Sequence, residues 1–148
     1  MSYKIPISVL VVIHTPDMKM LLLERADHPG WWQSVTGSQN PGETLKQTAI
    51  RELWEETGLN AFDHVLRDAG YENTYEIYEC YRHRYTPGTT HNTEHVFSLE
   101  LPAPVPVKLE PREHLNQLWL PASKAADKCF SPSNAEAILR LASGKINR

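Results

Sequence analysis

The sequence predicts an α+β fold, with helices packed on a mixed β-sheet. Segments typical of strands outnumber the helical ones, and the two kinds follow one another without regular alternation. The 148 residues suit a single domain that buries a core without disulfide or metal support. Since no repeat or linker divides the chain, we expect residues 1–148 to form one domain.

Three strands are predicted before residue 40. Residues 7–14 form an apolar run rich in β-branched side chains, which is typical of a buried strand, and residues 18–25 form a second apolar run. A short strand is expected around residues 32–35. Residues 37–42 end in Asn-Pro-Gly, a sequence that favours a loop.

The second half of the chain predicts further strands and a final helix. Residues 71–85, with interleaved aromatic and polar side chains, predict a long strand or a hairpin, and residues 93–101 predict the strand that returns. A short strand is expected at 118–120 and a helix at 132–143. Before the short strand, four prolines favour an irregular extended crossing: Pro102, Pro104, Pro106 and Pro111.

A helix is also predicted from residue 45 to residue 57. Thr44 and Gln47 have the spacing of a capping box, in which the two side chains satisfy backbone amides of the first turn. Gly58 is suited to a left-handed cap at the other end. Apolar or small side chains recur every four residues and form the stripe that we expect to be buried: Leu45, Ala49, Leu53 and Thr57.

Composition excludes several classes of protein. A net charge of −3 gives no general attraction to nucleic acid or an anionic membrane, so a polyanionic ligand needs a local basic cluster or a bound metal. Cys80 and Cys129 lack the partners of a zinc site or a disulfide framework. Residues 7–13 lack the flanks of a signal peptide, and no apolar run is long enough to span a bilayer. We expect a cytoplasmic protein with reduced thiols.

Three glutamates lie close together on the helix predicted at 45–57. At about 100° per residue, Glu56 lies about 40° around the helix axis from Glu52, and Glu55 about 60° to the other side. We expect the three carboxylates to share one flank, with the apolar stripe facing the opposite way. Like charges at this spacing destabilise a helix unless a cation lies among them.

A solvated acidic face is the commoner explanation of such a cluster on an arbitrary helix. That explanation is weaker here, because a surface face usually carries lysines at complementary spacing. Arg51 is the only nearby cation, and Lys46 is too distant. Hard oxygen ligands grouped in this way are what Mg²⁺ or Mn²⁺ requires, so the sequence favours a divalent-metal site.

The helix and the loop before it carry one long motif. It consists of Gly37, five residues, Glu43, seven residues, and then residues 51–59, Arg-Glu-Leu-Trp-Glu-Glu-Thr-Gly-Leu. This pattern resembles the Nudix box, and every fixed position of the box is matched. The resemblance implies a Nudix hydrolase, with one domain in which a mixed sheet is sandwiched between helices. It also implies a reaction in which water attacks a phosphorus of a nucleoside-diphosphate-like substrate.

The resemblance further implies roles for residues of the box. Glu52 and Glu56 would be the principal metal ligands, with Glu55 joining them directly or through water. The Gly37 carbonyl would complete one coordination sphere. Two residues would hold the carboxylates in place: Arg51 and Glu43. The implied cofactor is Mg²⁺, with Mn²⁺ as the alternative, and the ion would lower the pKa of the attacking water.

Short segments outside the box carry a second resemblance. They are residues 3–12, 32–38, 82–88, 92–94, 113–115, 119–120 and 133–134. In order and spacing they resemble one subfamily, the bacterial dihydroneopterin triphosphate diphosphatases of folate biosynthesis. This resemblance spans nearly the whole chain and implies hydrolysis of dihydroneopterin triphosphate to the monophosphate, with release of pyrophosphate. The end of the box, residues 57–59, has the general superfamily form and does not indicate a subfamily.

The subfamily resemblance implies further site residues. Glu113, after the proline-rich crossing, resembles an additional carboxylate that would be a metal ligand or the general base, and an exposed loop glutamate is the alternative. Lys4, Arg25 and Thr36 match positions that contact substrate. The two basic side chains would bind phosphate, although Arg25 also suits an ordinary arginine at a strand end.

A strand segment and one serine complete the implied substrate site. The segment comprises Tyr75, Glu76, Ile77 and Tyr78, and an aromatic face is suited to a flat pterin. Cross-strand packing is the alternative for Tyr75 and Ile77. Ser131 matches another contact position and equally suits the cap of the last helix. The expected partner is a small polyphosphate, without nucleic acid, membrane or an obligate protein partner.

Two other functions stay open at this point. Tyr75, sixteen residues beyond Leu59, resembles a tyrosine of dinucleoside polyphosphate hydrolases. Nucleoside triphosphates and dinucleoside polyphosphates are therefore alternative substrates. The chain could instead be a non-catalytic Nudix module that binds a ligand, but such modules typically lose box carboxylates, and none is lost here.

Overall fold

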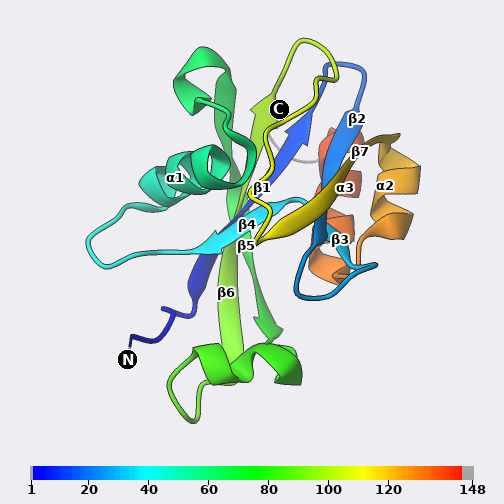
Figure 1. Ribbon diagram of the computed structural model, residues 1–148. Coiled ribbons are helices and arrows are strands. Elements are labelled where there is room, and N and C mark those ends of the chain that lie inside the picture. Colours follow the sequence, from blue (N-terminus) through cyan, green and yellow to red (C-terminus); the bar gives the residue numbers. More distant parts are fainter. Residues whose placement is uncertain (1, 145–148) are drawn as a thin grey trace.

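The computed structural model describes residues 2–144, and within them one mixed β-sheet is covered by helices on both faces (Figure 1). The strands are β1 (Ile7–His14), β2 (Lys19–Arg25), β3 (Trp32–Gln33), β4 (Val35–Ser38), β5 (Val65–Glu76), β6 (His91–Glu100) and β7 (His114–Pro121). The helices are α1 (Leu45–Thr57), α2 (Ala122–Lys128) and α3 (Pro132–Ala142), with the short 3₁₀ helices η1 (Ala61–Asp63) and η2 (Glu79–Arg84). The predicted fold class is confirmed.

The sheet is organised around β1. Its main path runs β3-β2-β1-β6-β5, while β4 also pairs with β1 and β7 with β2. The β1–β6 pair is parallel and the other pairs are antiparallel. Strands β1 and β2 share only a short register at His14 and Met20, so they diverge towards the other end, where β4 lies against β1.

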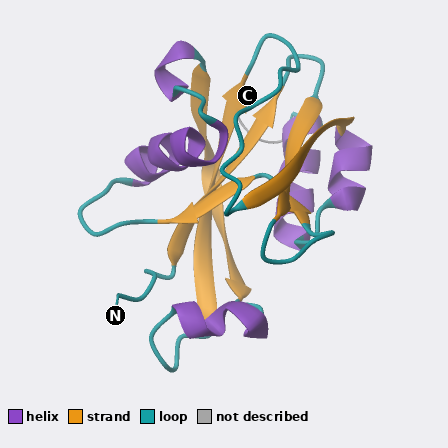
Figure 2. Ribbon diagram, in the orientation of Figure 1, coloured by secondary structure: helices purple, strands orange, loops and turns teal. Residues whose placement is uncertain are grey.

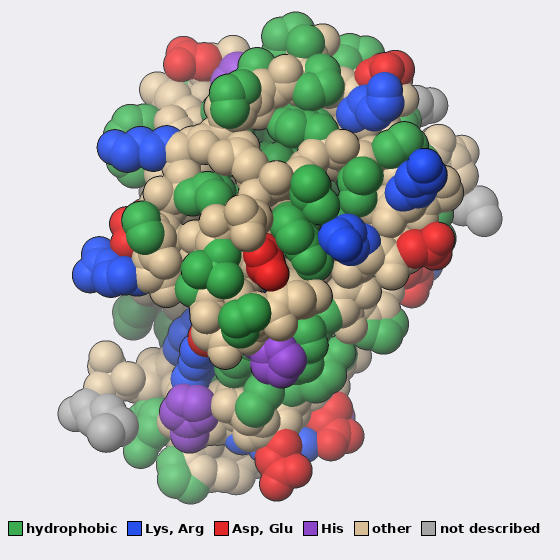
Figure 3. Space-filling model, turned by 45° about the vertical axis from the view of Figure 1, so that its right-hand side comes forward, with side chains coloured by type: hydrophobic (Ala, Val, Ile, Leu, Met, Phe, Trp, Pro, Cys, Tyr) green, Lys and Arg blue, Asp and Glu red, His purple; other side chains and the backbone are tan. Residues whose placement is uncertain are grey.

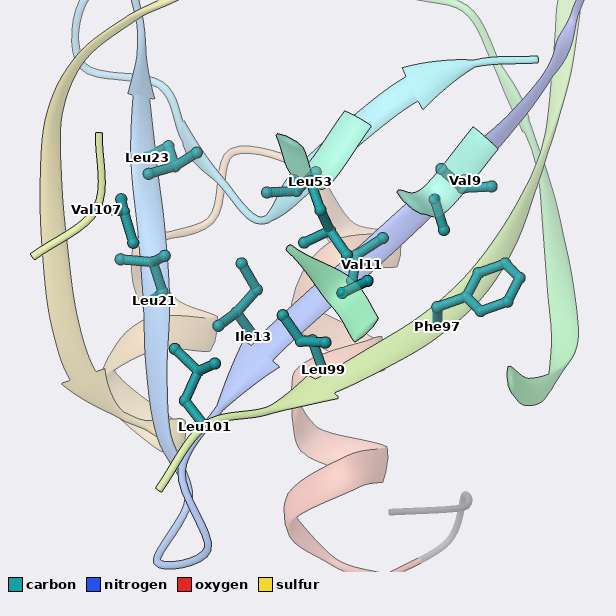
Figure 4. Close-up of a cluster of buried hydrophobic side chains, with 13 residues drawn as sticks. Val9, Val11, Ile13, Leu21, Leu23, Leu53, Phe97, Leu99, Leu101 and Val107 are labelled. Carbon is teal, nitrogen blue, oxygen red and sulfur yellow. The ribbon is translucent and has the colours of Figure 1, made fainter. Parts of the chain in front are cut away.

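Strand β1 is buried on both faces, as its continuous apolar run predicts. Val9 and Val11 belong to the core under α1, where Leu53 lies over them (Figure 4). Leu10 and Val12 belong to the second core, under α2 and α3. Helix α1 therefore covers one face of the sheet, and α2 and α3 cover the other (Figure 2).

The strand expected at 32–35 is two strands that pair with different neighbours. β3 pairs with β2 and β4 pairs with β1, with Ser34 between them. Asn134 of α3 holds this junction, because its Oδ1 accepts from Ser34 N (2.8 Å) and its Nδ2 donates to Ser34 Oγ (2.9 Å). A contact 100 residues away in the sequence is not visible in a local pattern.

The segment expected at 71–85 also differs from the structure. β5 begins earlier, at Val65, and ends at Glu76; η2 follows it. The register between β5 and β6 shifts between Asp68 and Glu72, and Gly70 adopts a φ of 79° there. This bulge interrupts the alternation of buried and exposed side chains, so the first half of β5 lacked the pattern that predicts a strand. Helix α2 was not predicted, and 118–120 is only part of the second half of β7.

Three observations complete the description. None of the helices in the described part of the chain is long and apolar enough to cross a membrane. Cys80 and Cys129 are free thiols. Residues 1 and 145–148, which the single-domain prediction included, lie outside the described residues.

Candidate active site

Helix α1 carries most of the box residues, and its own sequence fixes both of its ends. The predicted capping box is present: Thr44 Oγ1 accepts from Gln47 N (3.1 Å), and Gln47 Oε1 accepts from Thr44 N (2.9 Å). At the other end Gly58 is left-handed, with φ of 71°, and its N–H donates to the Trp54 carbonyl (3.0 Å). Fixed ends hold the helix, and with it the carboxylates, in one position against the sheet.

The rotation of α1 differs from the prediction. Glu52 and Glu56 are buried, with 9% and 1% of their surface exposed, whereas the Glu55 side chain is 50% exposed. The expectation of three carboxylates on one flank, opposite the apolar stripe, was wrong. Glu56 lies seven residues after Ala49, which is only about 20° short of two full turns, so it extends the buried stripe instead of opposing it.

Gly37 of β4 allows α1 to approach the sheet closely. A Cβ atom at this position would overlap the carboxyl group of Glu52. Gly37 does not have a positive φ, so the glycine is required for space and not for its backbone conformation. Its backbone and the Glu52 carboxylate are therefore neighbours, as the box resemblance implies for a shared metal sphere.

Arg51 connects the helix to the loop before it. Its guanidinium donates to both oxygens of Glu43 (2.7 and 3.0 Å), to Glu52 Oε1 (2.8 Å) and to the carbonyl of Ser38 (2.9 Å). A longer contact of 3.3 Å reaches Glu55. The Arg51 hydrogen bonds lower the pKa of Glu43 to about 2, so this carboxylate stays ionised at neutral pH. The geometry fits the positioning role implied for Arg51 and Glu43.

Arg51→Lys is expected to lower kcat roughly 10–100-fold, by analogy with other groups that orient metal ligands. A lysine ammonium lacks the planar fork that binds Glu43, Glu52 and the Ser38 carbonyl together. Steady-state rates and the Mg²⁺ concentration for half-maximal rate measure the effect. Arg140→Lys, in the surface pair with Glu136, is the matched control. Equal activity in the two variants would contradict the positioning role.

Glu56 is a buried carboxylate without a hydrogen bond. Among the described residues neither of its oxygens accepts one, and the Nε2 of His114 lies 3.5 Å from Oε1. Burial and the neighbouring Glu52 raise its pKa well above the ordinary value. Burial and nearby Arg25 lower the pKa of His114 to about 4, so the imidazole is neutral at pH 7 and does not compensate the charge of Glu56.

The proline-rich crossing brings a further carboxylate to Glu56. The Lys108 amide donates to the carbonyl of Thr57 (3.0 Å), which attaches the crossing to the end of α1. One ligand atom from each of Glu56, Glu113 and His114 then lies within 4.8 Å of the others. Glu113 itself is exposed, but it lies beside the buried pair instead of in an unrelated loop.

These donors fit a divalent cation. The donor set consists mainly of oxygens. They come from the buried Glu56, from the buried Glu52 beside Gly37, and from the exposed Glu113. A cation bound there would compensate the charge that burial makes costly at Glu56. Glu55 lies on the outer side of the cluster, and His114 is a neighbouring donor that the sequence did not indicate.

A cavity of about 620 Å³, here called the carboxylate cavity, opens over this cluster. Its acidic lining residues are Asp27, Glu52, Glu56, Glu110 and Glu113. Its basic lining residues are Lys4, Arg25, Arg84 and Arg112. Arg25 and Arg84 pair with Asp27, and Arg112 pairs with Glu110, so these basic side chains lie among carboxylates. An anionic ligand therefore needs a bound metal there as well as the basic residues.

A second cavity of about 110 Å³, here called the aromatic cavity, adjoins the first. Aromatic side chains line it: Tyr75, Tyr78, Tyr81, Tyr85 and Phe130. Five residues line both cavities: Lys4, Gln33, Thr36, Gly37 and Arg84. The two cavities therefore meet where β4 passes between α1 and the opposite face of the sheet.

The structure brings most of the predicted substrate residues to these cavities. Lys4 and Thr36 line both, and Arg25 lines the carboxylate cavity. Arg25 is not an ordinary surface residue, because its side chain is 16% exposed and bonds to Asp27 and Gln33. Four further predicted residues line the aromatic cavity: Tyr75, Ile77, Tyr78 and Ser131.

Glu76 is the predicted substrate residue that lies apart from both cavities. Its side chain is 68% exposed and pairs with Arg82 at 2.6 Å. Alternation along β5 sends it to the side opposite Tyr75. Ser131 precedes α3, but its hydroxyl makes no capping bond and instead pairs with Ser133 Oγ (3.0 Å).

Several cavity residues were missed by the sequence interpretation, among them Gln33, Asn92, Glu94 and His114. Glu94 is buried on β6, and burial raises its pKa to about 7. Residues 91–95 are all polar, so nothing in the sequence marked Asn92 and Glu94 as the buried positions among them. Arg84 enters through η2, whose fold the sequence did not predict.

Basic side chains do not dominate the surface in Figure 3. On the face shown there, lysine and arginine side chains are dispersed among acidic and apolar ones. The basic residues that the site requires gather in the carboxylate cavity instead. Because five acidic residues line the same cavity, attraction for an anion there depends on a bound cation as well as on these basic side chains.

Comparison with known proteins agrees with this geometry. The NUDIX domain model matches residues 4–141. The dihydroneopterin triphosphate diphosphatase of Haemophilus influenzae is 44% identical over 142 residues, covering 93% of this chain and 88% of the relative. The enzyme of the same name from Escherichia coli K12 is 45% identical over 139 residues, covering 92% and 91%.

Solved structures give the same result. The E. coli dihydroneopterin triphosphate pyrophosphohydrolase superposes with a TM-score of 0.91 at 42% identity, over 97% of this chain and 99% of that one. An Ap4A hydrolase from C. elegans superposes with a TM-score of 0.75 at 20% identity, over 94% and 96%, which shows a shared fold. The matched domain, the identities over most of the chain and the intact box establish that this chain belongs to the Nudix hydrolase family.

Proposed function

We propose that this chain hydrolyses dihydroneopterin triphosphate to dihydroneopterin monophosphate and pyrophosphate, in a reaction that depends on Mg²⁺. The observation that carries the proposal is the junction of the two cavities at Thr36 and Gly37. An aromatic cavity suits a flat heterocycle, and a cavity with both acidic and basic residues suits a metal-bound polyphosphate. The identity of 44–45% to the dihydroneopterin triphosphate diphosphatases supports the choice of heterocycle.

The residues of the carboxylate cavity divide into two roles. Glu52, Glu56 and Glu113, with the Gly37 carbonyl, would hold Mg²⁺, and Mn²⁺ suits the same oxygen donors. When bound, the ion neutralises phosphate charge and lowers the pKa of the attacking water. A basic set would bind the phosphate oxygens through charge-assisted hydrogen bonds: Lys4, Arg25 and Arg84.

In the proposed step, water attacks a phosphorus of the anhydride bond between the retained phosphate and the pyrophosphate. A P–O bond forms to the water oxygen, and the anhydride P–O bond breaks. Glu113 is suited to take the proton from water, because its carboxylate is exposed in the cavity while Glu52 and Glu56 are buried against the sheet. The fragment whose phosphorus is not attacked leaves with the electron pair of the broken bond, and the products are the monophosphate and pyrophosphate. Under this proposal the enzyme acts in folate biosynthesis in the cytoplasm.

A substrate panel tests the proposal. With Mg²⁺ present, kcat/KM for dihydroneopterin triphosphate is expected to exceed that for dATP and for diadenosine tetraphosphate at least about a hundredfold, a ratio that a site with buried polar groups can supply. EDTA should abolish turnover, and added Mg²⁺ should restore it. A hundredfold preference for a nucleotide would contradict the proposed substrate. The absence of any Mg²⁺-stimulated phosphate or pyrophosphate release would instead support a non-catalytic module.

A further inference from the structure

The aromatic cavity has a polar side formed by β6. Asn92 and Glu94 alternate onto the same face of this strand, and they are 1% and 5% exposed. Glu94 pairs in register with Ser8 of β1, and Asn92 with Tyr75 of β5. Both residues line the cavity, on the side of the sheet opposite α1. Neither is among the residues that line the carboxylate cavity.

Each of these two side chains has one buried acceptor atom without a partner. Asn92 Nδ2 donates to Ser8 Oγ (2.8 Å) and to Tyr75 Oη (3.0 Å), which fixes the orientation of the amide. Its Oδ1 accepts no hydrogen bond from the described residues. A buried acceptor left in this state is unfavourable, so a ligand that supplies a donor at this position is favoured.

Glu94 is held in a similar way. Its Oε2 accepts a long hydrogen bond from Thr36 Oγ1 (3.4 Å), and the hydroxyls of Thr36 and Ser133 partly offset the effect of burial on its pKa. Its Oε1 accepts no hydrogen bond within the described part of the chain. The carboxyl group is therefore fixed at the cavity with capacity for at least one further donor.

The two acceptors are spaced along one strand. Residues i and i+2 on a strand lie about 6.6 Å apart, on the scale of a fused bicyclic ring. Tyr75, Tyr78 and Phe130 supply flat walls beside them. A heterocycle that enters between these walls would present its edge to Glu94 and Asn92.

The edge that matches a carboxylate is one with two adjacent N–H donors. The ring N–H and the neighbouring amino group of a 2-amino-4-oxopyrimidine, which is part of every pterin, point in parallel and pair with the two oxygens of one carboxylate. Adenine presents one donor beside one acceptor, so it satisfies only part of that group. A buried acceptor without its donor penalises such a ligand.

We infer that Glu94, with Asn92 beside it, is a specificity-determining residue that recognises the amino-pyrimidinone edge of the substrate heterocycle. This inference rests on the proposed function, since it names the contact by which a pterin would be selected. Glu94 would act on binding and not on the hydrolytic step. It lies on the opposite side of β4 from the carboxylates that would hold the metal.

Glu94→Gln tests the inference. Glutamine keeps the shape but places an N–H against one of the two ligand donors. With Mg²⁺, KM for dihydroneopterin triphosphate is expected to rise at least tenfold with kcat within about threefold, while KM for dATP changes less than about twofold. Glu100→Gln, at the other end of β6, is the control and should leave both KM values unchanged. An unchanged KM for the pterin substrate, or an equal rise for both substrates, would overturn the inference.

Direct binding separates this inference from the proposed function. Neopterin, which carries no phosphate, should bind the wild-type protein at least tenfold more tightly than it binds Glu94→Gln, as measured by fluorescence titration. If that difference appears but pterin triphosphate is not hydrolysed, the proposed function fails and the recognition role stands. If the triphosphate is hydrolysed and the two proteins bind neopterin equally, only the recognition role fails.

If Glu94→Gln does not fold, the inference can be tested by comparing two ligands on the wild-type protein. An analogue of neopterin with a carbonyl in place of the 2-amino group lacks one of the paired donors. It should bind at least tenfold more weakly than neopterin. Equal binding of the two ligands would overturn the assignment of Glu94 without reference to any variant.

Discussion

Glu56→Gln is expected to lower kcat about 10²–10³-fold while the protein remains folded. The carboxylate is 1% exposed, and neither oxygen accepts a hydrogen bond from the described residues. Its neighbours among the described residues, Glu52 and the neutral imidazole of His114, do not compensate a negative charge, and a bound cation would. Glutamine retains the volume but removes the charge that would bind the ion.

In the absence of metal, Glu56→Gln should be at least as stable as the wild-type protein, although its activity is lower. Without metal, an uncompensated buried carboxylate is unfavourable, and burial raises the pKa of Glu56 for that reason. In EDTA, the free energy of unfolding of Glu56→Gln should equal or exceed that of the wild-type protein. With Mg²⁺ added, the wild-type protein should gain stability that the variant does not gain.

Urea unfolding with and without Mg²⁺, together with steady-state rates, measures both effects. Glu136→Gln, in an exposed ion pair on α3, is the matched control and should behave as wild type in both assays. Near-normal activity of folded Glu56→Gln would remove Glu56 from the metal site. A large loss of stability in EDTA would show that the carboxylate has a structural partner.

Gly37→Ala is expected to lower kcat/KM at least about a hundredfold, because a displacement of about 1 Å in a catalytic group has that effect. The added Cβ would overlap the Glu52 carboxyl group, so either β4 or the side chain must move. Strand β4 and the Glu52 side chain each carry an oxygen that would coordinate the proposed metal. The Mg²⁺ concentration for half-maximal rate should rise together with the loss of rate.

Gly70→Ala distinguishes this effect from a general cost of replacing glycine. Gly70 has a φ of 79° and open space around its Cβ position, so alanine there should reduce stability by about 1–2 kcal/mol. Its activity should stay within about twofold of wild type. Equal activity of Gly37→Ala and Gly70→Ala would show that close contact between β4 and Glu52 is not needed.

The elements predicted most accurately are those whose signals are local. β1 and the capping box and C-terminal cap of α1 follow from short patterns at residues 7–14, Thr44, Gln47 and Gly58. The break between β3 and β4 depends on Asn134, and the early part of β5 on a bulge, so neither was visible in a local window. Helix η2 falls within residues 71–85, where interleaved aromatic and polar side chains predicted a strand or a hairpin.

For the site, too, the residues of the local motif were predicted, and those that depend on tertiary contacts were not. The box spacing predicted that Glu43, Arg51 and Glu52 act together, and their contacts agree. Helical angles alone misplaced Glu56, because the apolar stripe was assumed to exclude a carboxylate. Asn92 and Glu94 drew no prediction, because two polar residues on a strand reveal a cavity only when the walls across it are known.

The central claim is that Glu52 and Glu56, held against Gly37, bind the divalent cation on which the polyphosphate docks. A crystal containing Mn²⁺ and a non-hydrolysable triphosphate analogue tests it through the anomalous signal of manganese. The account predicts a peak about 2.0–2.3 Å from oxygens of these glutamates, with analogue phosphate oxygens bound to the same ion. A manganese peak elsewhere, with both carboxylates free of metal, would contradict it.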